Sequence, residues 1–243
     1  MSKRSAKPID CKCHDNNEIN NFYEHKDTRE FLVEYPNPNF EQNQMKLPFM
    51  LAICSSTSGG KTNCLLNIMR RFDNTFTQIY IANSGCEEPL YQLCKKKLKD
   101  GCIIVNSLSK LPSLESLEET KDQQKLFVFD DLVKTKNTGY IEQMYLRGRK
   151  LGCSCIYISQ SFYDIDPFIR KQLHYLILLK LSSQKEAKMI IRSYALGIPP
   201  EELLEIYKDA TKKHLDFLKI DIRSFDENRI FSKNFTQFYQ ITP

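Results

Sequence analysis

The sequence predicts an α/β fold built on a mostly parallel central sheet that helices cover on both faces. The first observation is the apolar run LPFMLAIC at 47–54, which lacks the alternation of a half-exposed strand and therefore indicates a strand buried on both faces. The second is that short apolar strands then alternate with amphipathic helices along the chain. The third is the length of 243 residues, which suits one such domain with a sizeable core.

The order of elements follows from these runs and from the turn residues between them. Strands are expected at 47–54, 77–82, 102–106, 125–130, 153–159, 174–180 and 215–222, and helices at 62–72, 88–99, 112–119, 139–149, 165–172, 183–195 and 199–211. Residues 1–45 are polar and are interrupted by Pro36 and Pro38. They predict an N-terminal arm, followed by a single domain over 46–243.

The segment between the first strand and the first helix has the composition of a phosphate-binding loop. Small residues, SSTSGG at 55–60, lead into Lys61 and Thr62. Backbone N–H groups of such a loop, with the positive end of the following helix, cradle a di- or triphosphate. Lys61 is expected to reach the β- and γ-phosphates, and the Thr62 hydroxyl to ligate Mg²⁺. The residues expected to contact the nucleotide are Ser56, Thr57, Ser58, Gly59, Gly60, Lys61, Thr62 and Asn63.

The loop departs from the usual pattern at its first position, where Ser55 stands in place of a glycine. Serine has less backbone freedom than glycine but is small enough to leave the anion site open. The alternative interpretation is that Gly60, Lys61 and Thr62 merely cap a helix. The buried strand before the loop favours the phosphate-binding interpretation.

Paired carboxylates end a second buried strand, KLFVFD at 125–130. An acidic residue at the tip of a strand next to a phosphate loop can hold Mg²⁺, which prefers hard oxygen ligands, and Asp130 has that position. The next residue, Asp131, is the candidate general base that orients the water attacking the γ-phosphate. An ordinary turn or helix cap is the alternative for this pair, and the Gly-Gly-Lys-Thr loop elsewhere in the chain favours the catalytic interpretation.

The charge and the cysteine content limit which partners and which cellular compartment the protein can have. The 35 Lys and Arg residues against 30 Asp and Glu residues give a net charge of +5, which is compatible with a polyanionic partner without requiring one. Basic runs at 95–99, 147–150, 170–171 and 208–213 are either solvated faces or nucleic-acid contacts. Nine scattered cysteines, no secretory signal and no membrane-length apolar run predict a reducing, cytosol-like compartment.

A cysteine- and histidine-containing group near the N-terminus does not match the spacing of a zinc finger. It consists of Cys11, Cys13, His14 and His25, and no second cysteine pair follows nearby. The metal expected for this protein is therefore the Mg²⁺ of the phosphate site, with Thr62 and Asp130 as its protein ligands.

Three segments taken together resemble the FtsK and HerA superfamily of ring-forming ATPases: SSTSGGKTN, KLFVFDDL and GRKLGCSCIYISQS. Within that superfamily, their order and spacing are most similar to the poxvirus-type genome-packaging ATPases of large eukaryotic DNA viruses, virophages and related mobile elements. The resemblance covers residues 45–222 and implies a three-layer phosphate-loop NTPase fold of the ASCE, RecA-like kind. It also implies that the strand ending in Ser159 and Gln160 is inserted between the loop strand and the Asp130 strand.

The resemblance implies two further site residues. Gln160 would lie beside the γ-phosphate as a polar sensor, and the alternative is a glutamine at an ordinary loop start. Arg149 would reach the nucleotide of a neighbouring subunit, where a guanidinium stabilises transition-state charge. Arg147 competes for that role, and both arginines could instead be surface or DNA-facing charges.

The function implied is hydrolysis of ATP with Mg²⁺, coupled to packaging of double-stranded DNA into a preformed capsid. The implied partners are duplex DNA, further copies of the chain in a pentameric or hexameric ring, and a capsid portal or vertex protein, with no membrane. The implied location is a viral factory in the host cytoplasm or the virion. Other possibilities are another translocase of the same superfamily, a phosphate-loop nucleoside or nucleotide kinase, and a non-enzymatic adaptor with a decayed loop. Intact Lys61, Thr62, Asp130 and Asp131 disfavour the last.

Overall fold

The computed structural model describes residues 20–84, 88–132 and 138–241, which fall into two compact units divided between Glu34 and Tyr35. In the first unit, residues 20–34 form the short helices η1 (Phe22–Glu24) and α1 (Lys26–Arg29), neither of which buries a side chain. Residues 35–45, which the sequence analysis assigned to the arm, lie in the second unit. Asn43 and Met45 are fully buried there, because the Asn43 amide donates to the Arg71 carbonyl (3.1 Å) and Met45 joins an apolar core cluster.

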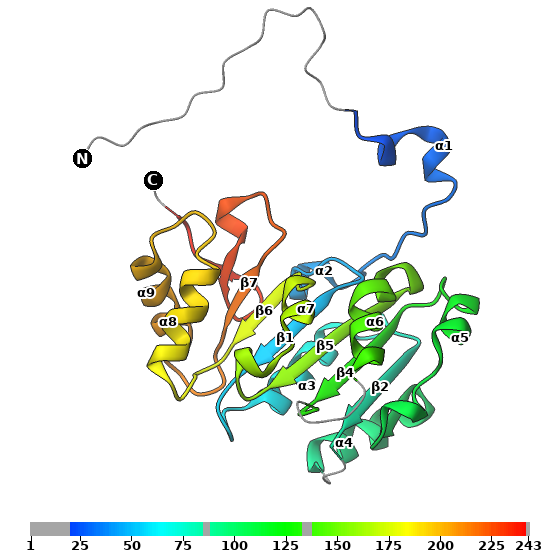
Figure 1. Ribbon diagram of the computed structural model, residues 1–243, viewed down its shortest axis with the longest axis horizontal. Coiled ribbons are helices and arrows are strands. Elements are labelled where there is room, and N and C mark those ends of the chain that lie inside the picture. The colour runs from blue at the N-terminus through cyan, green and yellow to red at the C-terminus, as the bar shows by residue number, and fades with distance from the viewer. Residues whose placement is uncertain (1–19, 85–87, 133–137, 242–243) are drawn as a thin grey trace, which may run out of the picture. The chain divides into compact units, whose positions relative to one another are not determined.

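One nine-stranded sheet organises the described part of the second unit (Figure 1). Its order is β3-β2-β4-β5-β1-β6-β7-β8-β9. The first six strands in that order are parallel: β3 (Cys102–Val105), β2 (Gln78–Asn83), β4 (Lys125–Asp130), β5 (Cys153–Ser159), β1 (Met50–Cys54) and β6 (Tyr175–Leu178). The last three pair antiparallel: β7 (Leu218–Asp221), β8 (Phe231–Lys233) and β9 (Gln237–Phe238). The predicted mostly parallel α/β fold is confirmed.

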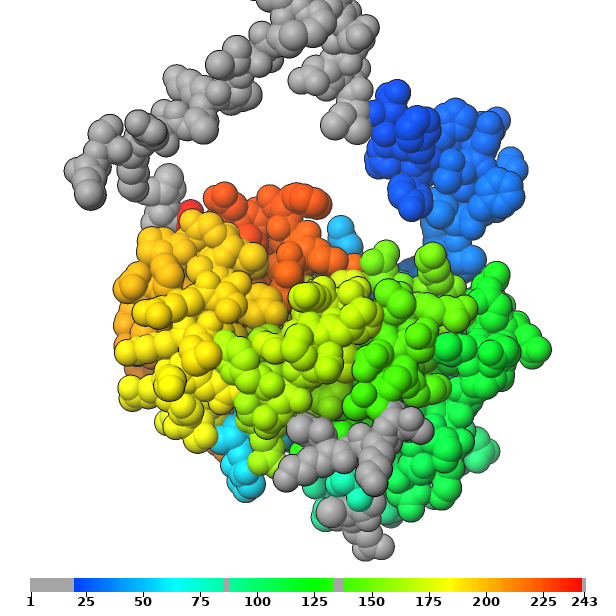
Figure 2. All heavy atoms as spheres, viewed as in Figure 1, coloured from blue at the N-terminus to red at the C-terminus, as the bar shows by residue number. Residues whose placement is uncertain are grey.

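Helices cover both faces of this sheet, and alternate strand residues separate the two apolar layers. Met50 and Ala52 point into one core cluster, together with side chains of α6 (Gly139–Arg147), α7 (Pro167–Lys171), α8 (Gln184–Ser193) and α9 (Pro200–Ala210). Leu51 and Ile53 point into the other cluster, together with side chains of α3 (Lys61–Arg71) and α4 (Pro89–Leu98). Two short helices complete the set, α2 (Phe40–Asn43) and α5 (Leu114–Glu119). The α8 and α9 segments form one side of the molecular surface (yellow to gold in Figure 2).

The structure differs from the expected elements mainly after residue 215. The strand expected at 215–222 is limited to β7, and two further strands, β8 and β9, were not predicted. They are three and two residues long, too short to leave an alternating pattern in the sequence. None of the helices in the described ranges is both long enough and apolar enough to span a bilayer. The six described cysteines are buried free thiols.

Candidate functional site

The carboxyl ends of β1, β5 and β4 lie side by side at one edge of the sheet. Ser159 pairs with Cys54 across β5 and β1, and Asp130 pairs with Ile158 across β4 and β5. Strand β5 therefore lies between the other two, as the resemblance implied. In an open parallel sheet, ligands bind beyond the carboxyl ends of the strands, so the residues that follow these strands share the expected ligand edge.

The two glycines of the loop after β1 answer different constraints. A Cβ on Gly59 would lie 1.9 Å from Ser55 Oγ and 2.9 Å from the Ser56 carbonyl oxygen, whereas a Cβ on Gly60 would lie 2.4 Å from the flexible end of the Leu215 side chain. Gly60 also has a φ of 91° and immediately precedes α3. Ser55 is fully buried and is not among the positive-φ residues of the described ranges, so its position does not need a glycine. Ser58 instead has the left-handed conformation, with a φ of 58°.

Lys61 bends back over this loop at the start of α3. Its Nζ donates to the carbonyls of Ser55 (3.2 Å) and Ser56 (3.1 Å). Burial lowers the pKa of Lys61, while the negative charges of Asp130 and Asp131 act in the opposite direction. Both carboxylates therefore act electrostatically on the Lys61 ammonium group. Its hydrogen bonds go to neutral carbonyl oxygens, which a phosphate can replace as acceptors.

Asp130 is half-buried at the end of β4 and is bonded to a tyrosine that the sequence analysis did not identify. Tyr91 on α4, only 1 % exposed, donates its phenol proton to Asp130 Oδ2 at 2.5 Å. Burial raises the pKa of Asp130, and the Tyr91 hydrogen bond opposes that rise because it favours the ionised form. The charge of Asp131 raises the pKa of Asp130 further, and Lys61 lowers it.

Asp131 is exposed and has a left-handed backbone with a φ of 52°. Its N–H donates to the carbonyl of Ile158 on β5 at 3.2 Å, which fixes the backbone at the ligand edge. Aspartate is one of the few non-glycine residues that adopt this conformation readily, and residues in sparsely populated conformations gather at functional sites.

Gln160 joins the tip of β5 to the phosphate loop. Its Oε1 accepts a hydrogen bond from Thr57 Oγ1 at 2.9 Å. The residues after Gln160 are held by Glu186 on α8, whose Oε1 accepts from Ser161 Oγ and from the Phe162 N–H, each at 2.8 Å. Sequence reasoning did not identify Glu186, since no local pattern relates it to β5.

A cavity of about 430 Å³ lies against the phosphate loop. Ser56 to Gly59 form one side of it, and Lys180 and the 211–216 segment form the other. That segment contributes two cationic side chains, Lys212 and Lys213. The volume falls in the range of small-molecule sites, and the loop and lysines suit an anionic ligand. Asn63, also expected to contact the nucleotide, lines a mostly apolar cavity of about 490 Å³ between α3 and α4.

The oxygen donors at this edge suit Mg²⁺. The Asp130 carboxylate and the Thr62 hydroxyl are hard ligands, and Mg²⁺ typically takes one or two of these from protein and the rest from water and phosphate. Over the described ranges, no group of three His, Cys, Asp or Glu side chains could hold a metal by itself. Of the N-terminal cysteine and histidine group, Cys11, Cys13 and His14 lie outside the described residues, and His25 is exposed.

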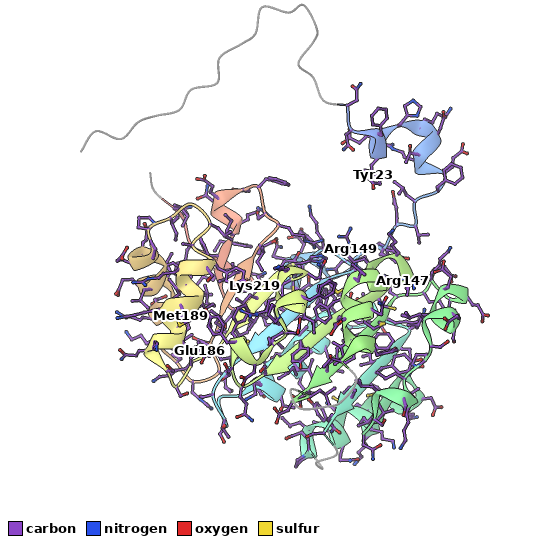
Figure 3. All side chains as sticks on the ribbon, in the orientation of Figure 1. Tyr23, Arg147, Arg149, Glu186, Met189 and Lys219 are labelled. Carbon is purple, nitrogen blue, oxygen red and sulfur yellow. The ribbon has the colours of Figure 1, made fainter. Side chains whose placement is uncertain are left out.

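The two arginines lie at the opposite end of β5. Arg147 ends α6, and Arg149 belongs to the short helix η4 (Gly148–Leu151) that leads into β5; both are exposed (Figure 3). Arg149 also helps to lower the pKa of His174, which precedes β6, so it lies near the amino ends of the strands. Seven residues of β5, or about 20 Å, separate this end from Gln160. The structure does not bring the arginines to the phosphate loop of the same chain.

Comparisons with known proteins match the chain to one family and to several folds. Residues 37–234 match the family described as Poxvirus A32 protein. The genome packaging NTPase B204 of Sulfolobus turreted icosahedral virus 2 is similar in complex with AMPPCP (TM-score 0.54, 17 % identity) and with sulfate (TM-score 0.57, 16 % identity). These matches cover 78 % of this chain and 98 % and 97 % of B204, respectively.

A further similar structure is EssC (ATPases 2 and 3) from Geobacillus thermodenitrificans, with a TM-score of 0.54 and 14 % identity over 79 % of this chain and 40 % of that one. A search of curated proteins found no match. At these identities the solved structures establish the fold alone. The family match covers well over half of the sequence and confirms the resemblance to the poxvirus-type proteins: the chain belongs to the poxvirus A32 protein family.

Proposed function

We propose that this protein is the ATP-hydrolysing motor that packages double-stranded DNA into a preformed viral capsid. The observation that carries the proposal is the gathering of the Lys61 loop, the Asp130–Asp131 pair and Gln160 at one edge of the sheet. Membership of the A32 family supports it. So do similar structures of B204, described as a genome packaging NTPase and solved with AMPPCP and ATP-γS.

ATP would bind with its triphosphate on the loop and the rest of the molecule in the adjoining cavity. Backbone N–H groups of the loop and the start of α3 would hold the phosphates. Lys61 would leave the carbonyls of Ser55 and Ser56 for phosphate oxygens, a stronger, charge-assisted interaction. Mg²⁺ held by Asp130 and Thr62 would supply neutralisation of the phosphate charge.

Hydrolysis needs a positioned water, and Asp131 and Gln160 are the residues that would provide it. Asp131 would orient the water and accept its proton. Gln160 would exchange its hydrogen bond with Thr57 for one with the γ-phosphate or the water, so its position would report the state of the nucleotide. The combination of Asp131 and Gln160 favours transfer of the phosphoryl group to water. A kinase would instead transfer that group to a nucleoside or nucleotide acceptor.

Arg149 would act on the nucleotide of a neighbouring subunit. It is about 20 Å from Gln160 along β5, too far to serve its own site. A ring of five or six copies would bring Arg149 of one subunit to the loop of the next, where its guanidinium would stabilise transition-state charge. Duplex DNA would pass through the ring, which would dock on a portal or vertex protein of the capsid, in a viral factory of the host cytoplasm or on the virion.

The test measures phosphate release from ATP by the full chain, with and without duplex DNA, beside displacement of a third strand from a triplex. We expect the third strand to be displaced only when ATP is present, and the rate of phosphate release to rise when duplex DNA is added. Lys61→Ala is the control and should abolish both. Phosphate transfer to a nucleoside would contradict the proposal in favour of a kinase, and ATP hydrolysis without strand displacement would contradict the motor.

A further inference from the structure

Helix α8 buries one face and exposes a cationic one. Ala187, Ile190 and Ile191 pack into the core, whereas the opposite face exposes Lys185, Lys188, Met189 and Arg192. Cations at 185, 188 and 192 recur at intervals of three and four residues, so they share one face of the helix over about 10 Å. Figure 3 labels Met189 on this face, and Figure 2 shows the segment in yellow at the surface.

None of these three cations is paired with an acidic side chain in the described part of the chain. Neither an ion pair nor a hydrogen bond involves Lys185, Lys188 or Arg192 there, whereas Lys208 on the neighbouring α9 pairs with Glu205 at 2.7 Å. A row of uncompensated positive charge is a complementary surface for a chain of phosphates, because each contact releases a condensed counterion from the nucleic acid.

A second exposed run of lysines, 95–97 on α4, has a different geometry. Its members are consecutive, and consecutive residues on a helix diverge by about 100°. They cannot all face one strand of phosphates, whereas the α8 residues can. The α4 run therefore supplies the same charge without the alignment.

Helix α8 is also hydrogen-bonded to the two residues that follow the expected nucleotide sensor, Gln160. Glu186, in its first turn, accepts hydrogen bonds from Ser161 Oγ and the Phe162 N–H, immediately after Gln160. Gln160 in turn accepts from Thr57 of the phosphate loop. A continuous path of hydrogen bonds and adjacent residues thus runs from the loop, through the tip of β5, to the helix that carries the cationic face.

We infer that the α8 face formed by Lys185, Lys188 and Arg192 binds the phosphate backbone of duplex DNA, and that Glu186 is the positioning residue that links it to Gln160. The inference rests on the proposed function, since it names the DNA-contacting surface of that motor. Contacts to phosphate carry no base information, so binding is independent of sequence. A change in the contacts of Gln160 during hydrolysis would move the start of α8 and hence the DNA grip.

The test compares two full-length variants that each lose three positive charges. One is Lys185→Gln with Lys188→Gln and Arg192→Gln, and the other is Lys95→Gln with Lys96→Gln and Lys97→Gln. Glutamine preserves helix propensity at these exposed positions. The α8 variant should bind duplex with a salt slope smaller by about 0.9 for each lost contact, lose DNA stimulation and retain its basal ATPase rate. The α4 variant should match the parent in salt slope, in DNA stimulation and in basal ATPase rate.

Glu186 is tested separately through coupling. Glu186→Ala should retain duplex binding but lower the ratio of DNA-stimulated to basal turnover, and Glu186→Gln, which keeps an acceptor oxygen, should restore that ratio. An unchanged salt slope in the α8 variant, or equal losses in the two triple variants, overturns the assignment of the surface. A parent protein that neither binds duplex nor responds to it overturns the proposed function itself, which separates the two failures.

Discussion

Tyr91 and Asp130 are joined by a 2.5 Å hydrogen bond from the tyrosine phenol to the carboxylate. Tyr91 comes from helix α4 and Asp130 from strand β4, and the two residues are 39 positions apart in the chain. The bond fixes one oxygen of the proposed magnesium ligand and favours its ionised form against the effect of burial.

Removal of this hydrogen bond should shift the pH dependence of ATP turnover. In Tyr91→Phe the pKa of Asp130 rises further above its usual range, so the carboxylate is protonated, and activity is lost, at a higher pH than in the parent. The measurement is the acidic limb of the kcat/KM profile for ATP with Mg²⁺. Tyr140→Phe is the matched control, because Tyr140 donates its phenol proton to the Pro112 carbonyl (2.8 Å). If the acidic limbs of Tyr91→Phe and the parent superimpose, Tyr91 does not influence the ionisation of Asp130 in catalysis.

Substitutions of Asp131 and of Lys61 should have different effects on ATP hydrolysis and on ATP binding. Asp131→Asn keeps a residue that tolerates the left-handed φ of 52°, so it removes the base without new backbone strain. It should bind ATP normally and lose about 10²- to 10⁴-fold in turnover. Lys61→Ala should lose nucleotide binding as well as turnover. Fluorescent-nucleotide titration and phosphate release distinguish these outcomes, and parental turnover in Asp131→Asn would exclude the base role.

The trans role of Arg149 predicts complementation between two inactive variants. Arg149→Ala subunits retain an intact phosphate loop, and Lys61→Ala subunits retain Arg149. A mixed ring therefore contains some interfaces at which an intact loop faces an intact Arg149. Equal mixing should restore about a quarter of parental turnover if the interfaces act independently. The same mixing with Arg147→Ala tests the competing arginine. No recovery above the sum of the separate variants would refute action across the interface.

His174 should make the fold sensitive to mild acid. Its Nδ1 accepts from the Met50 N–H at 3.2 Å, and burial lowers the pKa of His174 from 6.5 to about 3. Below pH 6.5 the unfolded chain binds a proton that the folded chain does not, so stability falls as pH drops toward 3. The loss between pH 7.5 and 5 should be about 2 kcal/mol from this residue.

His174→Asn provides the comparison, since its side-chain oxygen can accept the same N–H and does not titrate. Urea unfolding at the two pH values should give a smaller acid-induced loss for this variant than for the parent. Equal losses in both proteins would mean that other groups cause the acid sensitivity.

The sequence was most informative where the signal was local. Continuous apolar runs identified β1, β4 and β5, and small residues before Lys61 identified the loop, because both patterns lie within a few neighbouring positions. The resemblance supplied the insertion of β5, which no local pattern encodes.

The remaining parts of the site depend on contacts between distant segments. Tyr91 reaches Asp130 from another helix, Glu186 lies 25 positions beyond Ser161, and Leu215 packs over Gly60 from the segment before β7. Only the folded sheet brings these residues together, so spacing along the chain does not reveal them. The distance of Arg149 from its own loop follows in the same way from the direction of β5.

The most direct test is an electron-microscopy reconstruction of the full chain with a non-hydrolysable ATP analogue and duplex DNA. It should show a closed ring with the triphosphate on the 56–62 loop, its γ-phosphate within hydrogen-bonding reach of Lys61 and Gln160, and Asp130 on the accompanying metal. A triphosphate bound elsewhere, or Lys61, Asp130 and Gln160 directed to separate places, would contradict the account.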